Sequence, residues 1–260
     1  MTRALILAAG QGTRLRPLTD SRPKCLVPLF GKPLLERQLD TMRACGIERI
    51  QVATGYCREQ IEAYGLPTSF NPRFDSTNMV ESLMCDRDYL TADEDLLIAY
   101  GDIVYEEKNL QALLASTEEL SLMIDKNWRA LWSLRLEDPL SDAETLKIND
   151  GLVTELGKKP QSYEQIQGQY TGLIKVRADK VQDLLAHYDS LDRDGTYDGK
   201  NFDNMYMTSF LQSLIDSGWA VRAAIISGGW LEIDSVDDIE CYEALYQAGD
   251  LQPFYKPGSP

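Results

Sequence analysis

Two glycines and four basic residues stand within positions 10 to 24 of this 260-residue chain. Gly10 and Gly12 follow the apolar run 4–9, and the basic residues are Arg14, Arg16, Arg22 and Lys24. Glycines let the backbone turn sharply and approach a ligand, and successive N–H groups there can surround an anion. Arginine and lysine add charge-assisted hydrogen bonds. The stretch therefore predicts a triphosphate site, with a solvated basic loop as the alternative.

Two common glycine motifs do not fit this stretch. The dinucleotide motif GxGxxG fails because Leu15 stands at the third glycine position. The phosphate-loop motif GxxxxGK[ST] fails because Pro33 follows Gly31-Lys32. The pattern that is left after these exclusions is a strand, a glycine turn and a lysine between Pro23 and Pro28.

Composition limits the function classes. The chain has 43% hydrophobic and 26% charged residues, as ordinary globular proteins do. A net charge of −15 argues against broad nucleic-acid binding, although it leaves room for a local basic site.

The cysteines and the apolar segments indicate a cytoplasmic protein. Five scattered cysteines form no CxxC pair, and the single histidine completes no zinc pattern. We expect reduced thiols, no signal peptide and no membrane span, because no apolar run approaches about 20 residues.

The first half alternates strand and helix signals. Strands are predicted at 4–9, 49–55, 69–74 and 95–102, and helices at 33–47, 58–65 and 76–90, the last capped by Ser76 or Thr77. This rhythm predicts a parallel, doubly wound sheet, whose ligands bind beyond the carboxyl ends of the strands.

The second half favours antiparallel strands. These are predicted at 119–126, 145–151, 152–158 and 169–176, with further strands at 220–226 and 228–234 and helices at 178–191, 201–218 and 235–249. The predicted fold is an α/β, doubly wound, Rossmann-like mixed sheet with an inserted β-rich lobe. We expect one domain, 1–249, with a nucleotide-binding half (1–118), a mixed acceptor-binding half (119–234) and a tail (250–260).

The stretch "LAAGQGTRLRPLTDSRPKCLVPLFGKPLL" resembles the signature of the nucleotidyltransferases that activate sugar phosphates and phosphocholine. Its three parts, LAAGxGTRLxPLT, PKxLxP and GKP, occur in order. The resemblance implies that Lys24 contacts the α-phosphate and that Arg14 acts with it in catalysis. It also implies a nucleotide site, whose residues are Leu7, Ala8, Ala9, Gly10, Gly12 and Thr13.

Two acidic residues match the metal ligands of that family. Gly101-Asp102 resembles its Gly-Asp, and "WLEIDSVDDI" places Asp234 as the second carboxylate, with Glu232 two residues earlier. The resemblance implies that Asp102 and Asp234 hold Mg²⁺, which prefers hard oxygen ligands. On residues alone, Asp102 is a turn residue, and Asp234 or Ser235 caps the last helix.

Weaker similarities predict which residues bind the nucleotide base and the acceptor. "NPRFDSTNMVESL" resembles the phosphocholine and phosphonate cytidylyltransferase branch and adds Asn78, Ser82, Gly55 and Tyr56 to the predicted nucleotide site. The predicted acceptor residues are Lys159, Tyr170, Gly172, Asp203 and Trp230, with Lys158 as the alternative to Lys159. An amine-bearing acceptor needs a carboxylate or an aromatic face.

The predicted function is a Mg²⁺-dependent cytidylyltransferase that transfers CMP from CTP to phosphocholine, aminoethylphosphonate or a similar acceptor and releases pyrophosphate. Such an activity serves cell-surface polysaccharide or phosphonate synthesis. The alternatives are a sugar-1-phosphate nucleotidyltransferase using dTTP, UTP or GTP, and an inactive nucleotide-sensing subunit. No nucleic-acid or membrane partner is expected, and aromatic residues near the C-terminus leave open a homodimer.

Overall fold

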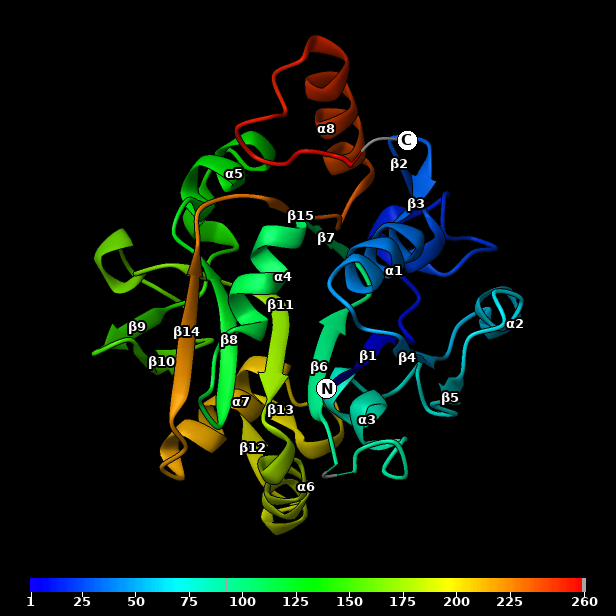
Figure 1. The fold of residues 1–260 in the computed structure, drawn as a ribbon. Helices are drawn as coiled ribbons and strands as arrows, with labels where there is room; N and C mark the ends of the chain where they lie inside the picture. The colour runs from blue at the N-terminus through cyan, green and yellow to red at the C-terminus, as the bar shows by residue number, and fades with distance from the viewer. Residues whose placement is uncertain (92, 259–260) are drawn as a thin grey trace.

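The computed structural model describes residues 1–91 and 93–258. A nine-stranded mixed sheet forms its centre, in the order β5-β4-β1-β6-β11-β8-β14-β10-β9 (Figure 1). The strands are β1 (Thr2–Ala8), β4 (Arg49–Thr54), β5 (Thr68–Phe70), β6 (Asp95–Tyr100), β8 (Leu120–Asp125), β9 (Leu146–Asn149), β10 (Leu152–Leu156), β11 (Gln169–Val176) and β14 (Val221–Ile226).

Short strands and eight helices complete the described fold. The short strands are β2 (Pro28–Leu29), β3 (Lys32–Pro33), β7 (Ile103–Tyr105), β12 (Thr196–Tyr197), β13 (Lys200–Asn201) and β15 (Trp230–Glu232). The helices are α1 (Leu34–Ala44), α2 (Arg58–Glu62), α3 (Met79–Met84), α4 (Glu107–Leu114), α5 (Trp128–Arg135), α6 (Val181–Ser190), α7 (Met207–Asp216) and α8 (Val236–Ala248).

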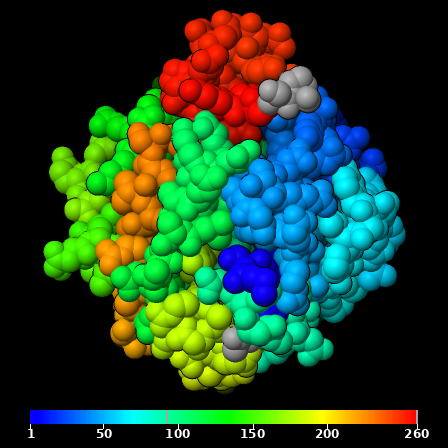
Figure 2. All heavy atoms as spheres, in the orientation of Figure 1, coloured from blue at the N-terminus to red at the C-terminus, as the bar shows by residue number. Residues whose placement is uncertain are grey.

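The sheet changes strand direction in its middle. β5, β4, β1 and β6 run parallel, which confirms the rhythm predicted for the first half. β11 then runs antiparallel to both β6 and β8, and β8 runs parallel to β14. The strands expected in the β-rich lobe thus continue the same sheet, and the two halves of the chain pack directly against each other (Figure 2).

Alternate residues of the central strands pack on opposite faces of the sheet. Ile6 of β1 belongs to one core cluster, with α1, α4 and α5, whereas Leu5 and Leu7 belong to the other, with α3, α6 and α7. Strands buried on both faces read as continuous apolar runs, which is why "ALILAA" was identifiable from its sequence.

Several predicted boundaries are wrong. The helix expected at 201–218 begins at Met207, because β13 and a 3₁₀ turn at 202–204 precede it. In place of the helix expected at 76–90, the structure has only the shorter α3. Its N-cap is Asn78, whose Oδ1 accepts from the N–H of Met79 at 2.8 Å. Helices α4 and α5 and strand β7 were not predicted.

The C-terminal aromatic residues divide between core and surface. Tyr242 and Tyr255 are buried, whereas Tyr246 is 43% exposed. The ring of Tyr255 lies 6.5 Å from that of Phe30, so the tail up to residue 258 packs on the N-terminal half. The last two residues of the predicted tail, 259–260, lie outside the described residues. None of the described helices is long and apolar enough to cross a membrane.

Candidate active site

The glycine turn after β1 is fixed beside Lys24. Gly12 has a left-handed backbone (φ +60°), and a Cβ there would lie 2.9 Å from the Cβ of Lys24. The hydroxyl of Thr19 donates to the Gly12 carbonyl at 2.8 Å. Because both the backbone angle and the close approach require glycine, this turn sets the position of the lysine.

Lys24 joins two carboxylates that are distant in sequence. Its Nζ donates to Oδ2 of Asp102 at 2.7 Å and to Oδ1 of Asp234 at 2.8 Å. Burial lowers the pKa of Lys24, but the two carboxylates outweigh it and hold the pKa above its usual value. The lysine therefore stays charged at neutral pH.

The antiparallel pair of β7 and β15 brings the two aspartates together. Glu232 pairs with Ile103, and the N–H of Ile233 donates to the Asp102 carbonyl at 3.0 Å. Asp102 directly precedes β7 and Asp234 follows β15, so both side chains leave the same end of this pair. The site thus depends on β7, which the sequence pattern missed.

One carboxylate oxygen of Asp102 is available to bind a ligand. Its Oδ1 is buried and has no hydrogen-bond partner among the residues that the structure describes. Those residues contain no group of three potential ligands for a metal ion. An unpartnered hard oxygen fits a divalent cation that takes its other ligands from water and substrate phosphates, as Mg²⁺ does.

Asp234 faces the lysine because Ser235 caps the helix. Ser235 and Asp238 form a capping box at the start of α8, and Oδ2 of Asp238 accepts from the backbone N–H of Asp234 at 2.8 Å. Arg14 also donates to Oδ1 of Asp234, at 2.8 Å. Burial raises the pKa of Asp234, but Lys24, Arg14 and Arg135 outweigh it, so that the pKa lies below its usual value.

Arg135 at the end of α5 was not predicted. Its guanidinium is 3% exposed and donates to Asp238 at 2.7 and 3.0 Å, to Glu232 at 3.2 Å and to Asp234 at 3.4 Å. Burial lowers the pKa of Arg135, and the neighbouring acidic groups more than reverse this. No sequence signal marked this residue, because it acts on acidic residues about 100 positions away.

A first cavity lies at the carboxyl ends of β1 and β6. Eight residues predicted for the nucleotide and metal sites line it: Leu7, Ala8, Ala9, Gly10, Lys24, Asn78, Ser82 and Asp102. Residues that the sequence did not single out, Phe74, Thr77 and Met79 among them, complete the wall. The structure therefore brings most of the predicted nucleotide residues to one place.

Four predicted nucleotide residues do not line this cavity. Gly12 and Thr13 belong to the turn beside Lys24. Gly55 packs behind the wall, since a Cβ there would lie 2.5 Å from both the Ala9 carbonyl and the Cβ of Phe74. The hydroxyl of Tyr56 donates to the Asp20 carbonyl at 2.6 Å.

A second cavity adjoins the first and shares Asn78 and Met79 with it. Tyr170, one of the residues predicted to bind the acceptor, lines this cavity. Its acidic lining consists of Asp142, Glu144, Glu232 and Asp234, and Arg14 is its one cationic lining residue among those described. Tyr206 and Thr208 lie on the same wall.

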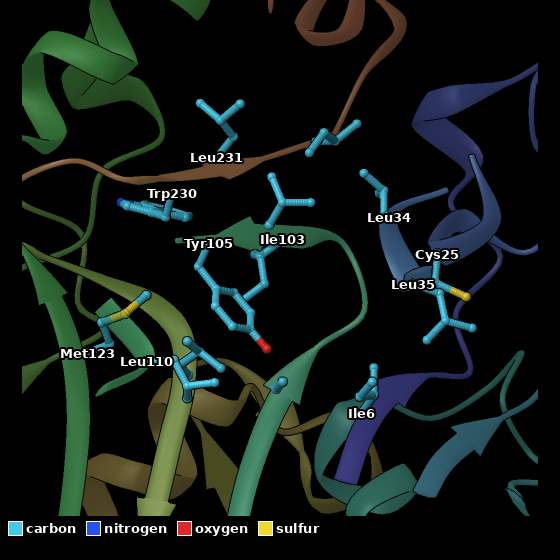
Figure 3. Packing of buried hydrophobic residues seen from close by; sticks show 14 of the residues in the cluster. Ile6, Cys25, Leu34, Leu35, Ile103, Tyr105, Leu110, Met123, Trp230 and Leu231 are labelled. Carbon is cyan, nitrogen blue, oxygen red and sulfur yellow. The ribbon is translucent and has the colours of Figure 1, made fainter. Parts of the chain in front are cut away.

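The other predicted acceptor residues lie elsewhere. Trp230 is 1% exposed, donates to Asp125 at 3.0 Å and packs over Tyr105 in the core, so it offers no face to the cavity (Figure 3). Asp203 pairs with Arg73 at 2.7 Å. Gly172, with φ +84°, makes room for the ring of Tyr100, which a Cβ would approach to 2.8 Å.

Neither candidate lysine lines either cavity. Lys159 donates to the carbonyls of Leu140, at 2.9 Å, and Ser141. Lys158 lies 3.6 Å from Glu155. These contacts give both lysines roles on the surface of the second half.

Glu144 is an acidic residue of the second cavity whose pKa lies above its usual value. Desolvation, with a smaller contribution from Asp142, raises its pKa to about 7. Within the described part of the chain its carboxylate accepts one hydrogen bond, from the hydroxyl of Thr208 at 3.5 Å. The sequence offered no motif for Glu144, which lies in a segment left without a predicted element.

Comparisons with known proteins identify relatives of this chain. A family model described as a MobA-like NTP transferase domain matches residues 4–130. A CTP:phosphoglutamine cytidylyltransferase from Campylobacter jejuni is 43% identical over 246 residues, which are 91% of this chain and 97% of that protein. A choline-phosphate cytidylyltransferase from Streptococcus pneumoniae is 44% identical over 85 residues, 31% of this chain and 37% of that one.

A solved structure extends the likeness to the whole fold. The inositol-1-phosphate CTP transferase from T. maritima superposes with a TM-score of 0.74 at 19% identity, over 98% of each chain. At this identity the superposition shows a common fold, and it confirms the predicted α/β class.

Replacing Arg135 should destabilise the protein. Arg135→Leu removes the buried cation from Glu232 and Asp238 and one of three cationic partners from Asp234, and we expect a loss of about 3–5 kcal/mol in the free energy of unfolding. Urea denaturation measures this loss. Arg129→Leu, an exposed position on the same helix, is the matched control. Equal stability of the two variants would contradict the role assigned to Arg135.

Glu144 should make stability depend on pH. Its folded pKa of about 7 exceeds the ordinary value of 4.5, so ionising the buried carboxylate costs folding free energy as pH rises through that interval. Glu144→Gln removes this cost. We expect the variant to match the wild type near pH 5 and to exceed it by about 1–3 kcal/mol near pH 8. Thermal melts across this range test the expectation, and a difference that does not grow with pH would contradict it.

Proposed function

Because the chain belongs to the nucleotidyltransferase family with a MobA-like NTP transferase domain, we propose that it transfers CMP from CTP to the phosphate of a small acceptor. Its full-length likeness supports the coarser statement directly: this is a cytidylyltransferase that acts on a phosphorylated substrate. We further propose Mg²⁺ as the metal and a phosphorylated or phosphonate compound of the phosphoglutamine kind as the acceptor.

One observation carries the proposed mechanism. Lys24 and Asp102 line the first cavity, Asp234 lines the second, and the lysine bonds both aspartates. The charged cluster therefore stands where the two cavities meet. This arrangement suits reaction at a nucleotide α-phosphate, because an acceptor oxygen must reach the α-phosphorus on the side opposite the leaving pyrophosphate.

The cluster has the charges that phosphoryl transfer needs. An acceptor phosphate oxygen would attack the α-phosphorus in line, a new O–P bond would form, and the bond to pyrophosphate would break. An acceptor phosphate is largely ionised at neutral pH, since its second pKa lies near 6, so no general base is required. The single histidine fits this reasoning, because His187 Nε2 bonds Ser213 on α7, and His187 lines neither cavity.

Each charged residue receives a proposed role. Lys24 would stabilise charge on the α-phosphate, and Arg14, whose side chain is 67% exposed, would reach the triphosphate. Asp102 and Asp234 would hold Mg²⁺, and Oδ1 of Asp102 supports this assignment because it has no hydrogen-bond partner among the described residues. Nucleotidyltransferases of this kind generally use a divalent metal, which when bound neutralises phosphate charge.

The two cavities support a division of the chain into a nucleotide-binding and an acceptor-binding half. The lining residues of the first cavity all lie between positions 7 and 102, within the proposed half 1–118. Most of the second cavity comes from residues 119–234, within the proposed acceptor-binding half. In the first cavity Ser82 accepts from the amide of Asn71 at 3.0 Å, and Asn78 caps α3, so we propose that these residues shape the nucleotide pocket.

Removing the cation of Lys24 should abolish most turnover. Lys24→Ala takes away one charge that stabilises the transition state, and we expect kcat to fall by about 10²–10³. The variant must first be shown to be folded by circular dichroism. Lys126→Ala, at an exposed lysine beyond both cavities, is the matched control. Near-normal pyrophosphate release by folded Lys24→Ala protein would disprove the role.

A pyrophosphate-release assay tests the proposed function itself. Each of four NTPs is combined with phosphoglutamine, phosphoethanolamine, phosphocholine, aminoethylphosphonate and glucose 1-phosphate, with and without Mg²⁺. We expect turnover with CTP and one of the first four acceptors, lost on addition of EDTA. Turnover of glucose 1-phosphate alone, or with another NTP alone, would show a sugar nucleotidyltransferase instead.

A further inference from the structure

The four carboxylates of the second cavity differ in their partners. Glu232 and Asp234 pair with Arg135, and Asp234 pairs also with Lys24 and Arg14. No cationic side chain lies within 4.0 Å of the carboxylate of Glu144 in the described ranges 1–91 and 93–258. Its neighbour Asp142 adds a second acidic group to the wall. The cavity thus contains two carboxyl groups, Asp142 and Glu144, that pair with no cationic side chain of the described residues.

Glu144 is held in a defined position. Its N–H donates to Oε1 of Gln169 at 3.0 Å, and its carbonyl accepts from Nε2 of the same side chain at 2.6 Å. The next residue, Thr145, is buried and bonds the backbone of Lys158 at 2.8 Å. Both backbone groups of Glu144 are therefore fixed to β11, and its side chain lines the cavity from an ordered wall.

A half-buried carboxylate that has no cationic partner carries a desolvation cost, and a ligand with a positive charge would offset that cost. The same cavity contains Asp234, at the charged cluster where the phosphate would react. An acceptor with a phosphate at one end and a positive charge at the other would therefore satisfy both ends of the cavity. Asp203, the carboxylate that the sequence suggested for this task, pairs with Arg73 instead.

We propose that Glu144 determines acceptor specificity by binding a primary ammonium group, so that the acceptors are phosphorylated primary amines. This inference rests on the proposed function and narrows its acceptor class. An ammonium group has three N–H donors, and Glu144, Asp142 and the hydroxyl of Thr208 provide acceptors on one wall. A quaternary ammonium has no such donors and would gain little from these oxygens.

The test compares matched acceptors that differ only in the amino group. One pair is phosphoglutamine and its analogue without the amino group, and the other is phosphoethanolamine and ethyl phosphate. The measured quantity is the ratio of kcat/KM within the pair that the wild type uses with CTP. We expect a preference for the amine of about 10- to 100-fold, the size of one charge-assisted hydrogen bond.

Glu144→Gln should bring this ratio close to one, and Glu144→Asp should restore part of it. Glu137→Gln, an exposed carboxylate in a loop of the same half, should keep the wild-type ratio. Loss of turnover that is equal for both members of a pair would mean a structural role and would overturn the inference. A wild type that prefers phosphocholine, or that does not distinguish the amine, would overturn it as well. Failure of the proposed function looks different, because the wild type would then release no pyrophosphate from CTP with any phosphorylated acceptor.

Discussion

The site depends on the ion pairs of Lys24 with Asp102 and Asp234. Three distant parts of the chain must meet to form them: the long loop after β1, the turn between β6 and β7, and the segment after β15. Desolvating these charges is costly, and only their mutual attraction offsets it. The parallel strands bring the first two segments to one edge of the sheet, and the β7–β15 pair adds the third.

Charge balance explains why Arg135 matters although it lines neither cavity. Four carboxylates, Asp102, Glu232, Asp234 and Asp238, gather around Lys24, Arg14 and Arg135. The carboxyl groups thus outnumber the basic groups by one. Burial and the charge of Asp234 raise the pKa of Glu232, and without Arg135 this repulsion would be stronger. A guanidinium with several donors can hold three carboxylates apart at fixed geometry, which a lysine cannot do.

The sequence predicted those parts of the protein that local patterns encode. The strand before Gly10, the turn at Gly12 and the carboxylates Asp102 and Asp234 follow from short motifs. Arg135 and Glu144 could not be found in this way, since they act on residues far away in sequence and no periodic pattern marks them. Trp230 shows the opposite error: it adjoins a motif, yet its side chain points into the core and bonds Asp125. A residue that lies close in sequence to a functional motif need not point its side chain toward the functional site.

The mixed sheet also explains how one site can combine two specificities. β11 runs antiparallel between β6 and β8, and Gln169 at its start holds the backbone of Glu144. The wall proposed for the acceptor is therefore attached to β11, which pairs with β6 of the proposed nucleotide-binding half. Changes at Glu144 or Thr208 can alter the acceptor wall without moving Lys24, because the lysine is fixed by contacts to the turn at Gly12 and to the two aspartates. The residues proposed for catalysis and the residue proposed for acceptor choice are thus held by different parts of the fold.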